Sequence, residues 1–153
     1  MVWTGLLLKQ CLLLFWALWF SVAWLANICD GLHACHRLGA GWKFASGNYA
    51  LLVETTRKYH PPQWLNAVLF VGVLCWEGGA ALLFWCAFGA FHGVHQPGAQ
   101  ALYPAFLVSL ALWAAFLLAD ELCLAYETEA THLRVFVAQL VSLLVLTVLP
   151  EGG

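Results

Sequence analysis

Charged residues are scarce in this chain of 153 residues. Asp, Glu, Lys and Arg together make up 9% of it, against about 25% in an ordinary soluble domain. The hydrophobic fraction is 63%, so a soluble protein of this size would expose apolar surface that it could not bury. A lipid bilayer is therefore the expected surrounding. No run of Lys or Arg indicates a nucleic-acid partner.

Several patterns that would indicate an enzyme are also missing. The sequence contains no nucleophile–base pair, no phosphate-binding glycine loop and no paired carboxylates of the hydrolase type. Its histidines fall at the ends of apolar segments or between them, whereas a transmembrane b-type haem usually needs them within spans. No cofactor is required by the sequence, and enzymatic activity is not expected.

Four apolar segments are each long enough for a helix that crosses a bilayer, which takes about 20 residues. They predict spans over residues 5–29, 64–91, 102–126 and 131–149. The first segment is longer than the apolar part of a signal peptide, so we interpret it as a retained span. The prediction is an all-α membrane protein, one domain over residues 1–153, with a tight hairpin around residues 127–129.

The segment between the first two spans is too long for a simple connector. Residues 48–59 have an apolar and a charged side, and Trp42 and Phe44 precede them as interfacial anchors. We therefore predict an amphipathic stretch, over residues 42–59, that lies in the headgroup layer.

Basic residues predict the orientation, because they accumulate in cytoplasmic loops. Lys9 opposes five others, which are Arg37, Lys43, Arg57, Lys58 and Arg134. We expect a cytoplasmic-membrane protein with loops one and three in the cytoplasm and both termini outside.

Glu77 is the residue whose burial in a membrane has the clearest cost in free energy. Thirteen residues of its uncharged run precede it (64–76) and fourteen follow it (78–91), which places it near the membrane midplane. An acid there costs about 2.5–3.5 kcal/mol and usually faces protein or water. It could be a proton or cation site, or an acid that hydrogen-bonds a quinone or an amine. It could equally be a structural carboxyl that locks the bundle.

We expect the Glu77 carboxyl to face protein, to be protonated at neutral pH and to donate to Ser109 or Gln139. Small residues recur every seven positions along the same span and predict a face for close helix packing. These residues are Gly72, Gly79, Cys86 and Gly93.

Acidic residues gather at the predicted third hairpin, close to His132 and Arg134. They are Asp120, Glu121, Glu127 and Glu129. The cluster could admit a cation or dock a basic partner. Alternatively, Arg134 pairs with Glu121 or Glu127 and holds the hairpin together.

Metal-competent side chains follow the first span at His33, Cys35 and His36. No standard zinc spacing is complete, so a metal site and ordinary polar loop residues both remain open.

Single residues at similar spacing suggest one family. They are Asn27, Asp30, Asn48, the pair Trp76–Glu77, Glu121 and Arg134. In these the chain resembles the bacterial family of predicted small four-span integral membrane proteins of unknown function. It departs from that pattern at residues 122–124 and 129–132. The resemblance implies the four-span fold and no assigned activity.

The composition and the packing face favour a non-enzymatic accessory or assembly subunit of a larger membrane complex. Its partners would be the lipid bilayer and either other membrane subunits or a second copy of the chain. The alternative is a cofactor-binding (quinone or haem) or proton- or cation-coupled membrane protein centred on Glu77.

Overall fold

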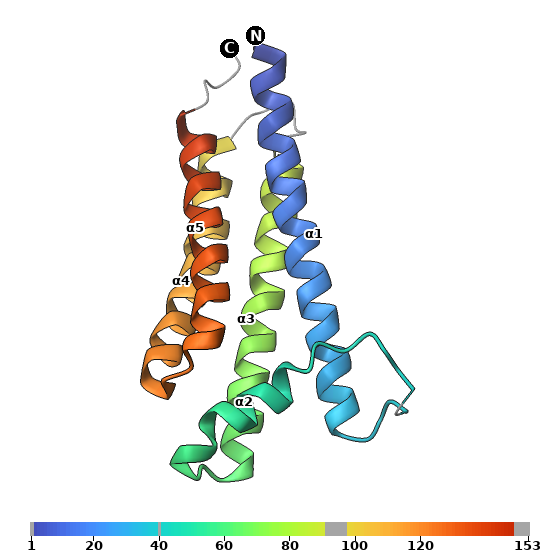
Figure 1. Ribbon diagram of the computed structural model, residues 1–153. Helices are drawn as coiled ribbons and strands as arrows, with labels where there is room; N and C mark the ends of the chain where they lie inside the picture. Colours follow the sequence, from blue (N-terminus) through green and yellow to red (C-terminus); the bar gives the residue numbers. More distant parts are fainter. Residues whose placement is uncertain (1, 40, 91–97, 149–153) are drawn as a thin grey trace.

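The computed structural model describes residues 2–39, 41–90 and 98–148 (Figure 1). Four helices are long and apolar enough to cross a membrane, which confirms the predicted all-α multi-pass architecture with four spans. No strand occurs in these ranges. The long helices are α1 (Val2–Ala34), α3 (Gln63–Ala90), α4 (Gly98–Cys123) and α5 (Tyr126–Val148). Between the first two lie the short helix α2 (Asn48–Thr56) and the 3₁₀ turn η1 (Arg57–Tyr59).

The long helices pack on their neighbours in chain order. The principal helix contacts are α1 with α3, α3 with α4 and α4 with α5, while α2 contacts both α1 and α3. The described residues therefore form an open bundle in which the spans follow one another in sequence order (Figure 1). Much of each span's apolar surface faces outward, as a bilayer-embedded helix requires.

An aromatic core joins three of the spans. Phe20 on α1, Phe84 on α3 and Phe106 on α4 are almost completely buried. The rings of Phe20 and Phe84 stack at 5.6 Å between centroids, and Phe106 meets Phe84 edge-on at 5.0 Å. Such pairs add stability beyond the area that they bury. This core occupies the half of the bundle that contains the start of α1.

The buried acids lie towards the other end, where α2 is found. Asp30, Glu77 and Asp120 come from three different helices, and each is about 6% exposed. Glu77 lies near the middle of α3, so it marks the border between the aromatic half and the polar half. The buried acids are thus separated from the aromatic core along the length of the bundle.

A glycine sets the closest approach of α1 and α3. A Cβ atom at Gly78 would lie 2.9 Å from Nε1 of Trp24 on α1, which is closer than packed atoms approach. The absence of a side chain therefore lets the indole lie directly on the backbone of α3, one residue from Glu77.

The predicted small-residue face does not pack within the fold. Cβ atoms at Gly72 and Gly79 would meet nothing within 4 Å, and Cys86 is exposed. Gly93 lies outside the described residues. Within the described chain this face therefore makes no close helix contact, and its packing against another span stays a prediction.

Two predicted boundaries also differ. Helix α1 continues to Ala34, five residues beyond the predicted end, and the turn between α4 and α5 is at Leu124–Ala125 instead of residues 127–129. Leu124 adopts φ 50°, and the Ala125 N–H donates to the Asp120 carbonyl at 2.8 Å, a typical helix C-terminal arrangement. Glu127 and Glu129 lie in the first turn of α5, where the helix dipole favours carboxylates. Hydropathy could not detect these ends.

The chain after α1 turns back along the helix that it has just left. The Ser46 N–H donates to the carbonyl of Ala26 at 3.3 Å, and Ala26 lies eight residues before the end of α1. At 1.5 Å per residue, the loop returns by about 12 Å along α1 (Figure 1). Gly47, with φ 78°, then allows the turn into α2. We call residues 35–46 the return loop.

Helix α2 lies on the start of α3. The Tyr49 ring meets Phe70 edge-on at 5.2 Å between centroids, and the Thr56 hydroxyl donates to Oδ1 of Asn66 at 3.0 Å. Trp42 and Phe44 are about half exposed, as interfacial anchors would be. An amphipathic segment between spans one and two is therefore consistent with the fold.

The close approach at Gly78 gives a test of the α1–α3 contact. We expect Gly78→Ala to lower the free energy of unfolding by about 1–3 kcal/mol, because the new methyl group overlaps the Trp24 indole. Gly79→Ala is the matched control, since its methyl group meets open space and helix propensity alone changes, by up to about 1 kcal/mol in favour of the helix. Unfolding in mixed micelles, followed by helical circular dichroism, measures both. Equal effects of the two substitutions would contradict the contact.

Candidate functional site

Glu77 faces the interior of the protein, as predicted, and one amide holds it. Nδ2 of Asn27 on α1 donates to both carboxyl oxygens of Glu77, at 2.9 Å to Oε1 and 2.7 Å to Oε2. Both side chains are nearly inaccessible, Asn27 at 2% and Glu77 at 6% exposure. This buried contact joins the first and second spans at the border between the aromatic and polar halves.

The hydrogen-bond partners predicted for Glu77 were wrong. The Ser109 hydroxyl donates to the carbonyl of Phe106 on its own helix, at 3.2 Å. Gln139 is fully buried, and its side-chain amide has no hydrogen-bond partner among the described residues. Glu77 is held by α1, whereas Ser109 and Gln139 belong to α4 and α5, and α5 has no principal contact with α3 in the described part of the chain.

Hydrogen bonds continue from Asn27 to the return loop. Its Oδ1 accepts from the Ser46 hydroxyl at 2.5 Å and from Nδ2 of Asn48 at 2.8 Å. Ser46 and Asn48 are both exposed. A continuous set of hydrogen bonds therefore runs from the protein surface to the buried acid. We call Ser46, Asn48, Asn27 and Glu77 the polar chain.

Asp30 fixes the start of α2 beside the polar chain. Its Oδ2 accepts from the backbone N–H of Tyr49 at 2.7 Å, which satisfies a donor that the first turn of a helix leaves free. The Ser46 hydroxyl lies 3.3 Å from the same oxygen. Because a hydroxyl has one proton, Ser46 donates to Asn27 or to Asp30 but not to both. Asp30 thus positions the loop end of the polar chain.

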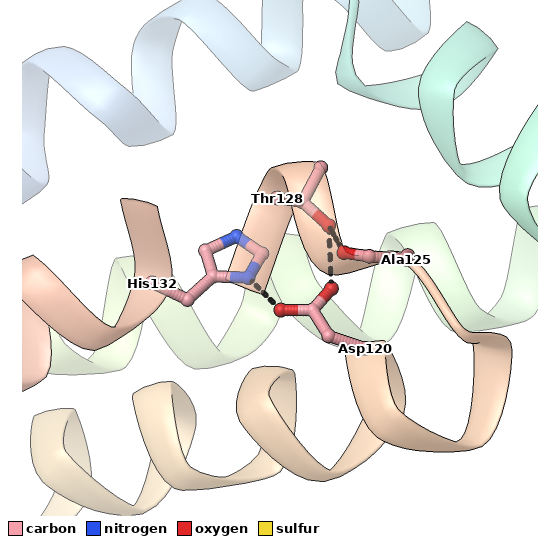
Figure 2. Close-up of polar contacts among 4 residues, drawn as sticks. All are labelled: Asp120, Ala125, Thr128 and His132. Carbon is pink, nitrogen blue, oxygen red and sulfur yellow. Dashed lines mark hydrogen bonds and ion pairs between the residues drawn. The ribbon is translucent and has the colours of Figure 1, made fainter. Parts of the chain in front are cut away.

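A second polar site lies at the α4–α5 turn (Figure 2). Nδ1 of His132 and Oδ2 of Asp120 are 2.5 Å apart, and the Thr128 hydroxyl lies 2.7 Å from Oδ1 of the same acid. The Thr128 hydroxyl is also 2.8 Å from the carbonyl of Ala125. Asp120 therefore connects the last turn of α4 to the first two turns of α5.

Aromatic rings of α4 hold the histidine from the side. The His132 ring stacks on Phe116 at 4.9 Å between centroids and lies 5.8 Å from Trp113. Its Nε2 points away from Asp120 (Figure 2), and no described residue forms a hydrogen bond with it. A carboxylate on one ring nitrogen fixes the orientation of the other, so the pair presents Nε2 in a defined direction.

The remaining residues of the predicted acidic hairpin do not gather around Arg134. The ion pairs in residues 2–39, 41–90 and 98–148 are His132–Asp120 and Arg57–Glu54, so the predicted pairing of Arg134 with Glu121 or Glu127 is absent. Arg134, Glu121 and Glu127 are exposed, and Glu129 is half-buried. A short turn brings α5 close enough for the histidine to reach Asp120, and this contact closes the hairpin instead.

The candidate metal ligands His33, Cys35 and His36 are all exposed at the end of α1 and the start of the return loop. No group of three or more His, Cys, Asp or Glu residues in the described part of the chain is placed to hold a metal ion.

No model of a known protein family, no curated protein and no solved structure shows significant similarity to this chain.

Sequence reasoning did not identify the partners of Glu77. Asn27 lies two residues from the end of the first predicted span (5–29), whereas Glu77 lies at the middle of the second (64–91), so a comparison of depths would not have paired them. Ser46 and Asn48 carried no signal either, because the path of a loop between two spans is not determined by its composition.

The Asn27–Glu77 contact predicts a coupled pair. Asn27→Leu should lower the free energy of unfolding by about 1–3 kcal/mol, because it leaves the buried acid without its donor. Glu77→Leu should lower the free energy of unfolding much less in the Asn27→Leu variant than in the wild type, since neither polar side chain then remains without a partner. A double-mutant cycle in mixed micelles measures the coupling. Additive effects would show that the two side chains do not interact.

The Asp120–His132 contact predicts a second coupling. His132→Ala and Asp120→Ala should be non-additive, by about 0.5–3 kcal/mol as for residues in direct contact. Arg134→Ala is the control and should change stability by no more than about 0.5 kcal/mol, as usual for a surface position. The same unfolding assay applies. A larger loss from Arg134→Ala than from His132→Ala would restore the arginine as the residue that closes the hairpin.

Proposed function

We propose that this multi-pass membrane protein binds and releases a proton at Glu77, in exchange with the aqueous phase on the side of the return loop. The observation that carries the proposal is the polar chain, in which two exposed residues reach a nearly inaccessible acid through a single amide. Acids within membrane spans mark proton and ion pathways in many proteins. A purely structural acid would need a partner but no connection to the surface.

A proton suits the site better than a metal cation. Hard cations take several oxygen ligands, but the group that faces Glu77 is the NH₂ of Asn27, which donates to both carboxyl oxygens. The amide oxygen of Asn27 is turned towards the loop instead. A cation bound at Glu77 would therefore face hydrogen atoms, whereas a proton requires only one acceptor.

The Asn27 amide links the protonation state of Glu77 to the return loop. An ionised Glu77 only accepts hydrogen bonds, and it suits the contacts of the structure, in which Nδ2 donates to the acid and Oδ1 accepts from Ser46 and Asn48. A protonated Glu77 is itself a donor and needs an acceptor. If the amide turns to offer Oδ1 to the acid, the hydrogen bonds that Ser46 of the loop and Asn48 of α2 donate to Oδ1 are lost. Proton uptake at Glu77 therefore weakens the attachment of the loop.

This linkage gives a test with two readouts. From an alkaline pH at which Glu77 is ionised, lowering the pH should convert its carboxylate infrared band to the protonated-carboxyl band and should speed hydrogen exchange in residues 41–46. Glu77→Gln should lose both responses and keep the faster exchange at every pH, because its amide can donate like the protonated acid. Glu121→Gln, which changes an exposed acid, should behave as the wild type. A Glu77 band that never responds to bulk pH would overturn the proposal.

A role as an accessory or assembly subunit is the second candidate, and one observation favours it. Gly72 and Gly79 lie on an outward face of α3 with open space beside them, and small residues allow close packing of helices within membranes. A partner span or a second copy of the chain would fit this face.

Gly72→Leu tests this second candidate. It should abolish cross-linking or co-purification of the partner in mild detergent while leaving the fold intact, because the larger side chain separates the helices. Ala119→Leu adds the same side chain at an exposed position of α4 and serves as the control. Association that survives Gly72→Leu, or its absence in the wild type, would argue against packing through this face.

A further inference from the structure

The described chain has a cleft between the interfacial segment and the α4–α5 turn, separate from the polar chain and from His132. Its volume is about 690 Å³, within the range of small-molecule sites. One wall comes from α2, η1 and His60, and the other from residues 123–128. The Tyr59 hydroxyl donates to the carbonyl of Leu122 and connects the two walls. We call this space the hairpin cleft.

Opposite charges lie on the two walls without meeting. Of the two cations in η1, Arg57 pairs with Glu54 on its own wall, at 3.0 Å. Lys58 on the same wall and Glu127 on the opposite wall have no ion pair with any described residue. The Lys58 ammonium lies 5.0 Å from the centroid of the Tyr59 ring. The cleft therefore offers one free cation and one free acid, with balanced charge.

Apolar side chains flank these charges. Leu51, Leu124 and Tyr126 line the cleft and are between 46% and 62% exposed. The cleft lies at the end of the spans beside an amphipathic segment, where headgroups meet acyl chains. A ligand that satisfies both kinds of surface has a zwitterionic head and an apolar body.

We propose that the hairpin cleft binds the phosphoethanolamine headgroup of an aminophospholipid, with the phosphate against Lys58 and the ammonium against Glu127. A headgroup that is only anionic would leave Glu127 unpaired and repelled. A choline headgroup cannot donate hydrogen bonds to the Glu127 carboxylate, whereas an ethanolamine ammonium has three donors. The exposed leucines favour a membrane lipid over the free, water-soluble headgroup.

Native mass spectrometry of the full chain in detergent, titrated with phosphatidylethanolamine, tests the proposal. Lys58→Gln and Glu127→Gln should each weaken binding about fivefold, the value of one charge at a membrane surface. Lys43→Gln and Glu121→Gln remove exposed charges outside the cleft and should leave binding unchanged. Equal affinity in all four variants would overturn the proposal.

A lipid series identifies the headgroup. Phosphatidylethanolamine should bind more tightly than phosphatidylcholine or phosphatidylglycerol, and Glu127→Gln should remove that preference while Lys58→Gln weakens all three. Water-soluble glycerophosphoethanolamine should not displace the lipid at equal concentration. Displacement of the lipid by glycerophosphoethanolamine would assign the site to a free phosphoethanolamine compound and would overturn the proposal of a lipid ligand. Preference for phosphatidylglycerol would overturn the zwitterionic headgroup.

Exchanging the two charges between the walls distinguishes loss of lipid binding from loss of folding in the single variants. In Lys58→Glu/Glu127→Lys the two charges remain balanced across the cleft, so a reversed headgroup should restore phosphatidylethanolamine binding relative to either single reversal. Helical circular dichroism and a monodisperse elution profile confirm the fold of each variant. If the double variant is folded but binds phosphatidylethanolamine no better than Lys58→Glu or Glu127→Lys alone, the result would contradict a headgroup that bridges the two walls.

Discussion

The hydrogen bonds from the Asn27 amide to the Glu77 carboxyl are the interaction on which the arrangement of this bundle depends. A carboxyl group near the middle of a span has no water to solvate it, and an unsatisfied polar group in an apolar medium costs several kcal/mol. One neutral amide meets this requirement, with its Nδ2 within hydrogen-bond distance of both carboxyl oxygens. The register of α1 against α3 is therefore fixed at one point, and the close contact of Gly78 with Trp24 lies beside it.

The buried acids and the aromatic core are separated along the bundle. Phe20, Phe84 and Phe106 pack on one another with rings that need no hydrogen bonds. Asp30 and Asp120 each have donors from their own neighbourhood, the N–H of Tyr49 and the side chains of Thr128 and His132. A buried polar group costs much less when such partners are present. The segments that supply these partners lie at the same end as α2.

The sequence was sufficient for the spans and for the burial of Glu77, because both follow from the cost of placing residues in hydrocarbon. It was insufficient for the helix ends, which depend on local hydrogen bonds such as the one from Ala125 to Asp120. The pairing of Asp120 with His132 instead of Arg134 with Glu121 follows from where that turn falls. The link from Ser46 to Glu77 depends on the path of the return loop, which neither hydropathy nor charge encodes.

The order of the spans has a consequence for biosynthesis. Because long helices that follow one another in the chain pack on each other, the bundle can assemble in the order in which the ribosome delivers it. Asn27 and Ser46 precede Glu77 in the chain, so the donor of the acid is already in the membrane when α3 arrives. The acid can therefore meet its donor as soon as α3 packs on α1. A circular permutant that placed α3 before α1 would present the acid before its donor.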